Sequence, residues 1–228
     1  MFKNGLTKSM ENARKAMARP FTFTFVIALA ALSSVAFAQE GTAIFGYYTN
    51  ANLAGVPDGL LYVVNPGSIS GLSPAGDLCA NIYVFRFDEP VECCSCKVTP
   101  DGLRTLNVNA DLTSNPIDSM RLPLPQSGII KIVSSAVESD GSCNAGMSFF
   151  PFPHFLPVAA AQYEPSGVLG ARITHVNATG AGMYSVSEAN FLAGPLADTE
   201  LSKKLQRICY FISTSGSGGL GICSCGTE

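Results

Sequence analysis

Cysteines are the residues of this chain whose type and spacing point most clearly to chemistry. Three of them fall within four positions in "CCSC" (93–96), and two more lie in "CSC" (223–225). Clustered cysteines can bind a metal ion, act as reactive thiols or form disulfides. The eight cysteines are Cys79, Cys93, Cys94, Cys96, Cys143, Cys209, Cys223 and Cys225.

The spacing favours disulfides between distant segments. Cys93 and Cys94 cannot comfortably bond to each other, because a vicinal disulfide strains the peptide between them. Neighbours in a strand also point to opposite faces, so we expect each to reach a different partner. Cys209 would then anchor a helix to a sheet. Sequence alone does not choose among the roughly one hundred pairings that eight cysteines allow.

Two Cys-x-Cys pairs could lie opposite one another. Cys94 and Cys96 share a face if their segment is extended, and so do Cys223 and Cys225. Bridges between the pairs would tie the C-terminal tail to the strand before "TPDG" (99–102). The alternative is a four-thiolate zinc site, but structural zinc usually uses Cys-x2-Cys knuckles. A redox centre would favour Cys-x-x-Cys in a βαβ unit, so we predict disulfides and no cofactor.

Other residues give weaker signals for chemistry. His154 and His175 are the only histidines, and without an HExxH motif we interpret both as structural hydrogen-bonding residues. The sequence has no GxSxG elbow and no phosphate-cradling glycine loop. Asp88, Glu89 and Glu92 could supply a carboxylate pair for glycoside hydrolysis, but a solvated acidic loop explains them better. We therefore predict no catalytic residue and favour a non-enzymatic role over an enzymatic one.

The first 38 residues have the features of a Sec-type signal peptide. A basic leader precedes the apolar run from Phe21 to Phe37, which closes on the small-x-small pattern at Ala38. We predict cleavage between Ala38 and Gln39, with Met17 as an alternative start. Retention as a membrane anchor is the other interpretation, although the run is short for a bilayer span. The predicted location is secreted or periplasmic.

The remaining chain is acidic. The whole sequence has 14 Lys+Arg and 17 Asp+Glu; without the five basic residues and one acidic residue of the leader, 9 and 16 remain, a net charge of −7. A net negative charge without a basic patch does not attract a phosphate backbone, so nucleic-acid binding is not expected. No second apolar stretch approaches a membrane span, so none is expected in the mature chain.

The mature chain, 39–228, has the pattern of one mainly β domain. Short apolar runs rich in aromatic and β-branched residues alternate with Gly, Pro and Asn turns. A helix is predicted near 198–213, where apolar residues fall on one stripe. The fold class is an antiparallel β-sandwich, Ig-like or jelly-roll-like, with one C-terminal α-helix and disulfide cross-links. Strands are expected over 41–50, 59–66, 81–87, 103–112, 128–135, 169–177 and 182–191.

The segment from Phe149 to Pro157, "FFPFPHFLP", combines four phenylalanines with three prolines. Its prolines disfavour a regular helix or a central strand. The phenylalanines either plug one end of the core, which we favour, or form an apolar patch for a protein partner. The identity of any partner stays open.

Two segments resemble a known family. "ECCSCKVTPDGLRTLNVNADLTSNP" (92–116) and "GSGGLGICSC" (216–225) are similar to a family of uncharacterised secreted bacterial proteins. The resemblance implies export and a shared fold, and it transfers no activity. We therefore expect a non-enzymatic envelope or extracellular module, structural or binding in role. The alternatives are an extracellular hydrolase that uses the acidic residues at 88–92 and a thiolate metal-binding protein.

Overall fold

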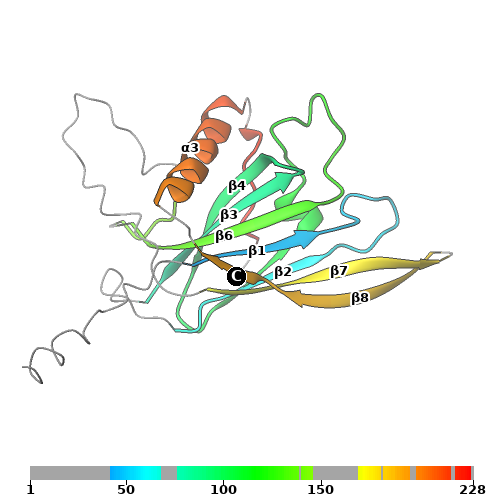
Figure 1. The fold of residues 1–228 in the computed structure, drawn as a ribbon, viewed down its shortest axis with the longest axis horizontal. Helices are drawn as coiled ribbons and strands as arrows, with labels where there is room; N and C mark the ends of the chain where they lie inside the picture. Colours follow the sequence, from blue (N-terminus) through cyan, green and yellow to red (C-terminus); the bar gives the residue numbers. More distant parts are fainter. Residues whose placement is uncertain are drawn as a thin grey trace, which may run out of the picture. The chain divides into compact units, whose positions relative to one another are not determined.

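The computed structural model describes residues 42–67, 76–138, 140–145, 169–180, 182–195, 199–216 and 219–226. These residues form two antiparallel sheets and one C-terminal helix, which confirms the predicted fold class (Figure 1). The predicted signal peptide, with its cleavage site at Ala38 and Gln39, and the Phe149–Pro157 segment lie outside the described residues. Both stay predictions.

The first sheet has five strands in the order β4-β3-β6-β1-β9. All of its pairings are antiparallel, and β3 lies between β4 and β6 over nearly its whole length. The strands are β1 (Thr42–Tyr48), β3 (Leu78–Arg86), β4 (Glu89–Val98), β6 (Gly128–Ala136) and β9 (Leu192–Pro195).

The second sheet has four strands in the order β5-β2-β7-β8. Strands β2 and β5 each follow a "PDGL" turn, and they pair with each other. The hairpin of β7 and β8 extends beyond the other strands at one end of the sheet (Figure 1). The strands are β2 (Leu60–Val64), β5 (Leu103–Asn107), β7 (Gly170–Gly180) and β8 (Met183–Asn190).

The main core fills the space between the two sheets. Ile82 and Val84 of β3 lie in one buried cluster with Ile132 of β6 and with Leu61 and Ile173 of the opposite sheet. This burial is the main favourable term for the fold, at about 25 cal/mol per Å² of apolar surface removed from water. The alternation of apolar residues along the strands therefore sets which side chains meet.

A second core lies on the other face of the five-stranded sheet, under α3 (Thr199–Ser215). Leu205, Cys209 and Ile212 form the buried stripe of this helix, as its periodicity predicts. They pack against Tyr83 of β3 and Cys93 of β4, so these strands are buried on both faces. Figure 1 shows α3 next to β4 and β3. Among the described residues no helix is long and apolar enough to cross a membrane.

The strand predicted over 103–112 is only half correct. Strand β5 ends at Asn107, and a π-helical turn, η1 (Val108–Leu112), follows it. The Thr113 hydroxyl donates to the Val108 carbonyl at 2.7 Å, and the Asp111 carboxylate accepts from the Asn107 N–H at 2.7 Å. Such local side-chain bonds offer the backbone an alternative to the sheet ladder.

Candidate functional site

The eight cysteines form four disulfides and leave none free. As predicted, the adjacent Cys93 and Cys94 reach different partners, and Cys209 anchors the helix. Cα separations of 5.2–5.7 Å suit disulfide geometry. The pairs are Cys79–Cys143, Cys93–Cys209, Cys94–Cys223 and Cys96–Cys225.

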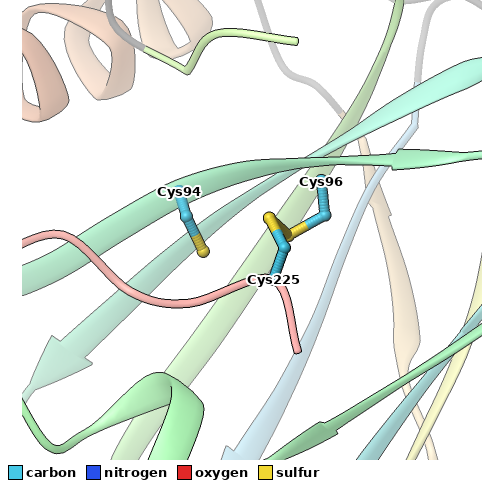
Figure 2. A group of neighbouring side chains, drawn as sticks. All are labelled: Cys94, Cys96 and Cys225. Carbon is cyan, nitrogen blue, oxygen red and sulfur yellow. A yellow bond between two sulfur atoms is a disulfide. The ribbon is translucent and has the colours of Figure 1, made fainter. Parts of the chain in front are cut away.

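The C-terminal tail runs along β4 as a short parallel partner. The Cys93 N–H donates to the Gly221 carbonyl at 2.9 Å, and the Cys223 N–H donates to the Cys93 carbonyl at 3.2 Å. Figure 2 shows Cys94 and Cys96 on β4, with the Cys96–Cys225 bridge beside the Cys94 sulfur. The sulfurs of Cys94, Cys96 and Cys225 lie within 4.8 Å of one another.

This sulfur cluster serves as a cross-link. Metal ions bind thiolates, and a sulfur held in a disulfide has no thiolate to offer. The cluster therefore fixes the tail to β4 in the state that the structure shows. Disulfides persist in oxidising compartments, so the four bridges fit an extracellular or periplasmic location.

The three acidic residues at 88–92 are not presented together. Asp88 and Glu89 are exposed where β3 turns into β4, as the solvated-loop interpretation predicts. Glu92 is fully buried within β4, so that interpretation is wrong for this residue. The acidic composition of 88–92 suggests exposure to solvent, but β4 is covered on both faces, so a side chain on either face is buried.

Glu92 accepts one hydrogen bond in its buried position. Its Oε1 accepts from the Asn115 N–H at 2.9 Å, and its Oε2 has no partner among the described residues. Burial disfavours the charged form and raises the pKa of Glu92 to about 8. Because this carboxyl has no surface on which to meet a substrate, we assign it no catalytic role.

A pocket of about 430 Å³ lies where strands of the two sheets approach each other. We call it the His175 pocket, after its most buried polar residue. Among the described residues, the polar side chains of the lining are the Tyr47 hydroxyl, His175 and Asn190. The apolar part of the lining comes from five strands and includes Phe45, Tyr47, Ile129, Ile173, Ala189 and Leu192.

His175 is held in this lining by stacking. Its ring lies on the ring of Tyr47, with centroids 4.1 Å apart and planes 16° apart. The residue is only 4% exposed, yet neither ring nitrogen has a hydrogen-bond partner in the part of the chain that the structure describes. The prediction of a structural hydrogen-bonding histidine is therefore not met there. Burial also lowers the pKa of His175, which keeps the imidazole neutral at pH 7.

Large apolar side chains line the pocket while remaining open to solvent. Tyr47 is 55% exposed, Leu192 is 63% exposed, and Phe45 and Ile129 are also classed as exposed. An apolar hollow with one or two convergent polar groups is the usual form of a small-molecule site. The exposed apolar rim and the unpaired imidazole together make this pocket the candidate functional site.

Sequence reasoning missed Tyr47 and the pocket as a whole. Tyr47 belongs to β1 and His175 to β7, and only the packing of the two sheets brings them together. The alternation of Phe45 and Tyr47 along β1 was the available signal for a shared face. It does not say which distant strand those rings meet.

Comparison with known proteins adds little to this description. No protein-family model and no curated protein matches the sequence. The chain is similar to a solved structure, "Crystal Structure of Thermotoga maritima 1070", at a TM-score of 0.36 and 12% identity. The match covers 69% of this chain and 97% of that one. A likeness at this level carries no argument about function.

Proposed function

We propose that the protein is an exported, non-enzymatic binding module that holds a small, largely apolar ligand in the His175 pocket. The observation that carries this proposal is the apolar lining of the pocket, in which Tyr47 and Leu192 stay 55% and 63% exposed. A ligand that covers these side chains removes apolar surface from water, which is favourable by about 25 cal/mol per Å².

The disulfide framework supports a role outside the cytoplasm. Four bridges attach a loop, the helix and the C-terminal tail to the five-stranded sheet, and such bonds persist in oxidising compartments. The basic leader with its Ala38–Gln39 cleavage site and the resemblance to secreted bacterial proteins support the same location. A rigid sandwich also holds a pocket in its binding geometry, which lowers the entropic cost of binding.

The surroundings of His175 favour binding over catalysis. A histidine base needs a hydroxyl, thiol or substrate proton within hydrogen-bond reach. Among the described residues no side chain bonds to either ring nitrogen, and all cysteines are in disulfides. The described residues therefore hold no nucleophile–base pair at this histidine.

A pocket-filling variant tests the proposal. Ala189 lines the pocket, so Ala189→Phe should occupy part of its volume. We expect a neutral solvatochromic dye such as Nile red to bind the wild type with one site, and to bind Ala189→Phe at least about tenfold more weakly, a loss of roughly 1.4 kcal/mol. Fluorescence titration measures both affinities.

Val186→Phe is the matched control. Val186 lies on the same strand, is exposed and does not line the pocket, so the added ring should leave dye binding unchanged. Equal losses in the two variants, or no saturable binding by the wild type, would overturn the proposal.

A further inference from the structure

We infer that the ligand of the His175 pocket is an amphipathic carboxylate, whose hydrocarbon tail lies in the pocket and whose charged group pairs with the Lys131 ammonium. This inference rests on the proposed function, because it names the class of molecule that the same pocket holds. Three observations carry it: the face of the sheet that the pocket borders, the place of Lys131 on that face, and the size and apolar character of the lining.

Four of the pocket residues lie on one face of the five-stranded sheet. Phe45 of β1 is paired with Leu192 of β9, and Tyr47 of β1 is paired with Ile129 of β6. Ile130, the next residue of β6, belongs to the core between the sheets, so alternation places the four side chains on the opposite face. All four are exposed. The pocket therefore borders an exposed apolar face of this sheet.

Lys131 places a positive charge on the same face. Figure 1 shows β6 between β1 and β3, and Lys131 of β6 is paired directly with Phe45 of β1. Paired side chains have Cβ atoms about 4.5–5.5 Å apart, so the lysine side chain begins at the border of the pocket. Its ammonium lies 5.2 Å from the centre of the Phe85 ring on β3. The cation is therefore held over apolar surface beside the pocket.

The Lys131 ammonium has no carboxylate partner among the described residues, whose ion pairs use Arg86, Lys97 and Arg172. Lys131 is half-buried, and solvent screens a charge less there than in bulk water. One ammonium without an arginine fork suits a carboxylate with a single charge. A phosphate group carries up to two charges and is recognised best by the bidentate guanidinium.

The lining suits a hydrocarbon tail. It has no charged side chain among the described residues, and both ring nitrogens of His175 are buried, so the pocket offers a ligand mainly apolar contacts. A charged group would lose its hydration there without replacement, and it therefore stays outside, at Lys131. An apolar cavity of about 150 Å³ accepts benzene, so a pocket of about 430 Å³ has room for a tail of roughly ten carbons.

Three ligands with the same ten-carbon tail test this class on the mature, disulfide-intact protein: decanoate, 1-decanol and decyltrimethylammonium. Each competes with Nile red at pH 7, below its micellar concentration, and the loss of dye fluorescence gives its affinity. We expect decanoate to bind most tightly and 1-decanol about fivefold more weakly, the upper range for an ion pair that solvent reaches. Decyltrimethylammonium, which Lys131 repels, should bind most weakly.

Lys131→Met keeps an unbranched apolar side chain and removes the charge. We expect it to bind decanoate about fivefold more weakly than the wild type does, and to bind 1-decanol with unchanged affinity.

Lys97→Met is the matched control, because it changes the net charge equally. Lys97 pairs with Asp77 at 2.7 Å and is the β4 partner of Cys79. The β6 partner of Cys79 is Ser135, four residues or about 13 Å along the strand from Lys131. Lys97→Met should therefore bind all three ligands as the wild type does.

The outcomes separate this inference from the proposed function. Unchanged decanoate affinity in Lys131→Met, or equal losses for decanoate and 1-decanol, would overturn the ligand class. Wild-type protein that binds decanoate no more tightly than 1-decanol would also overturn it, which decides the question even if Lys131→Met does not fold. In each case the pocket remains a binding site if Ala189→Phe still blocks the neutral dye. If the wild type binds neither the dye nor any of the three ligands, both proposals fail.

Discussion

Glu92 and His175 are both buried ionisable side chains, and burial moves their pKa values in opposite directions. The charged form of each loses hydration, so the pKa of the acid rises to about 8 and that of the imidazole falls. Both side chains are therefore mainly neutral in the folded protein near neutral pH. For Glu92 this has a consequence for stability, and for His175 it leaves the wall of the pocket without a charge.

The raised pKa of Glu92 predicts that stability falls as pH rises. Between its ordinary pKa of 4.5 and about 8, the folded state holds a proton that the unfolded state has lost. The contribution is therefore fully present below pH 4.5 and is lost by about pH 8, with about 1.4 kcal/mol for each unit of pKa difference. We expect Glu92→Gln, which cannot ionise, to lose this slope. Chemical unfolding at pH 5, 7 and 9 with intact disulfides measures it.

Glu89→Gln is the control for this measurement, because Glu89 is exposed on the same strand. It should keep the wild-type slope. His175 titrates with the opposite sign, but equally in all three proteins, so it cancels in the comparison. An unchanged slope in Glu92→Gln would show that Glu92 does not hold an extra proton in the folded state.

Strand β4 and the C-terminal tail form an element pair that is cross-linked twice. The bridges Cys94–Cys223 and Cys96–Cys225 are two residues apart on each segment. Once one of them closes the chain, the other closes only a very short additional loop. A loop of roughly five residues is worth about 2 kcal/mol and one of roughly 15 residues about 3 kcal/mol, so the second bridge to close adds less than the first.

This redundancy predicts non-additive effects. Removing one bridge, by Cys94→Ala with Cys223→Ala or by Cys96→Ala with Cys225→Ala, should cost about 2 kcal/mol of loop-closure free energy. Removing both also frees the tail beyond Cys209, a loop of roughly 15 residues worth about 3 kcal/mol, so the total loss should be about 5 kcal/mol, more than the sum of the two single losses. Alkylation without reduction should first show that the wild type has no free thiol. Chemical unfolding of the wild type and the three variants then measures the free energy of unfolding. Strictly additive losses would contradict the arrangement of the two bridges.

Elements with a clear local signal were predictable from the sequence. The alternation in 81–87 and the helical stripe in 198–213 place Ile82 and Leu205 in the cores where the structure has them. The segment at 103–112 was not predictable to its end, because Thr113 and Asp111 redirect the backbone through side-chain bonds. Strand β9 is only four residues long, and its pairing with β1 is not visible in so short a run.

For the molecule as a whole, covalent links could be anticipated better than the pocket. Strand geometry alone separates Cys93 from Cys94 and places each Cys-x-Cys pair on one face. It does not choose the partners, which the structure gives as Cys93–Cys209, Cys94–Cys223 and Cys96–Cys225. The His175 pocket depends on how two sheets close against each other and on the crossing from β8 to β9. Those are long-range contacts without a local pattern.

The packing of the two sheets against each other also explains why the pocket can bind a ligand. The two sheets share one buried core, and the helix and the C-terminal tail are cross-linked to β4 of the five-stranded sheet. A site whose walls come from both sheets therefore keeps its geometry without a ligand. This preorganisation is what the proposed function requires of the scaffold.

The most direct measurement follows the His175 ring itself. In protein labelled with ¹⁵N-histidine, only two imidazoles give signals, because the sequence has two histidines. His154→Gln and His175→Phe assign them. We predict that titration with Nile red shifts the ring signals of His175, which lines the pocket, in step with binding and leaves those of His154 unchanged. Saturable binding without a change at His175, or a change at His154 alone, would contradict the claim that this pocket is the binding site.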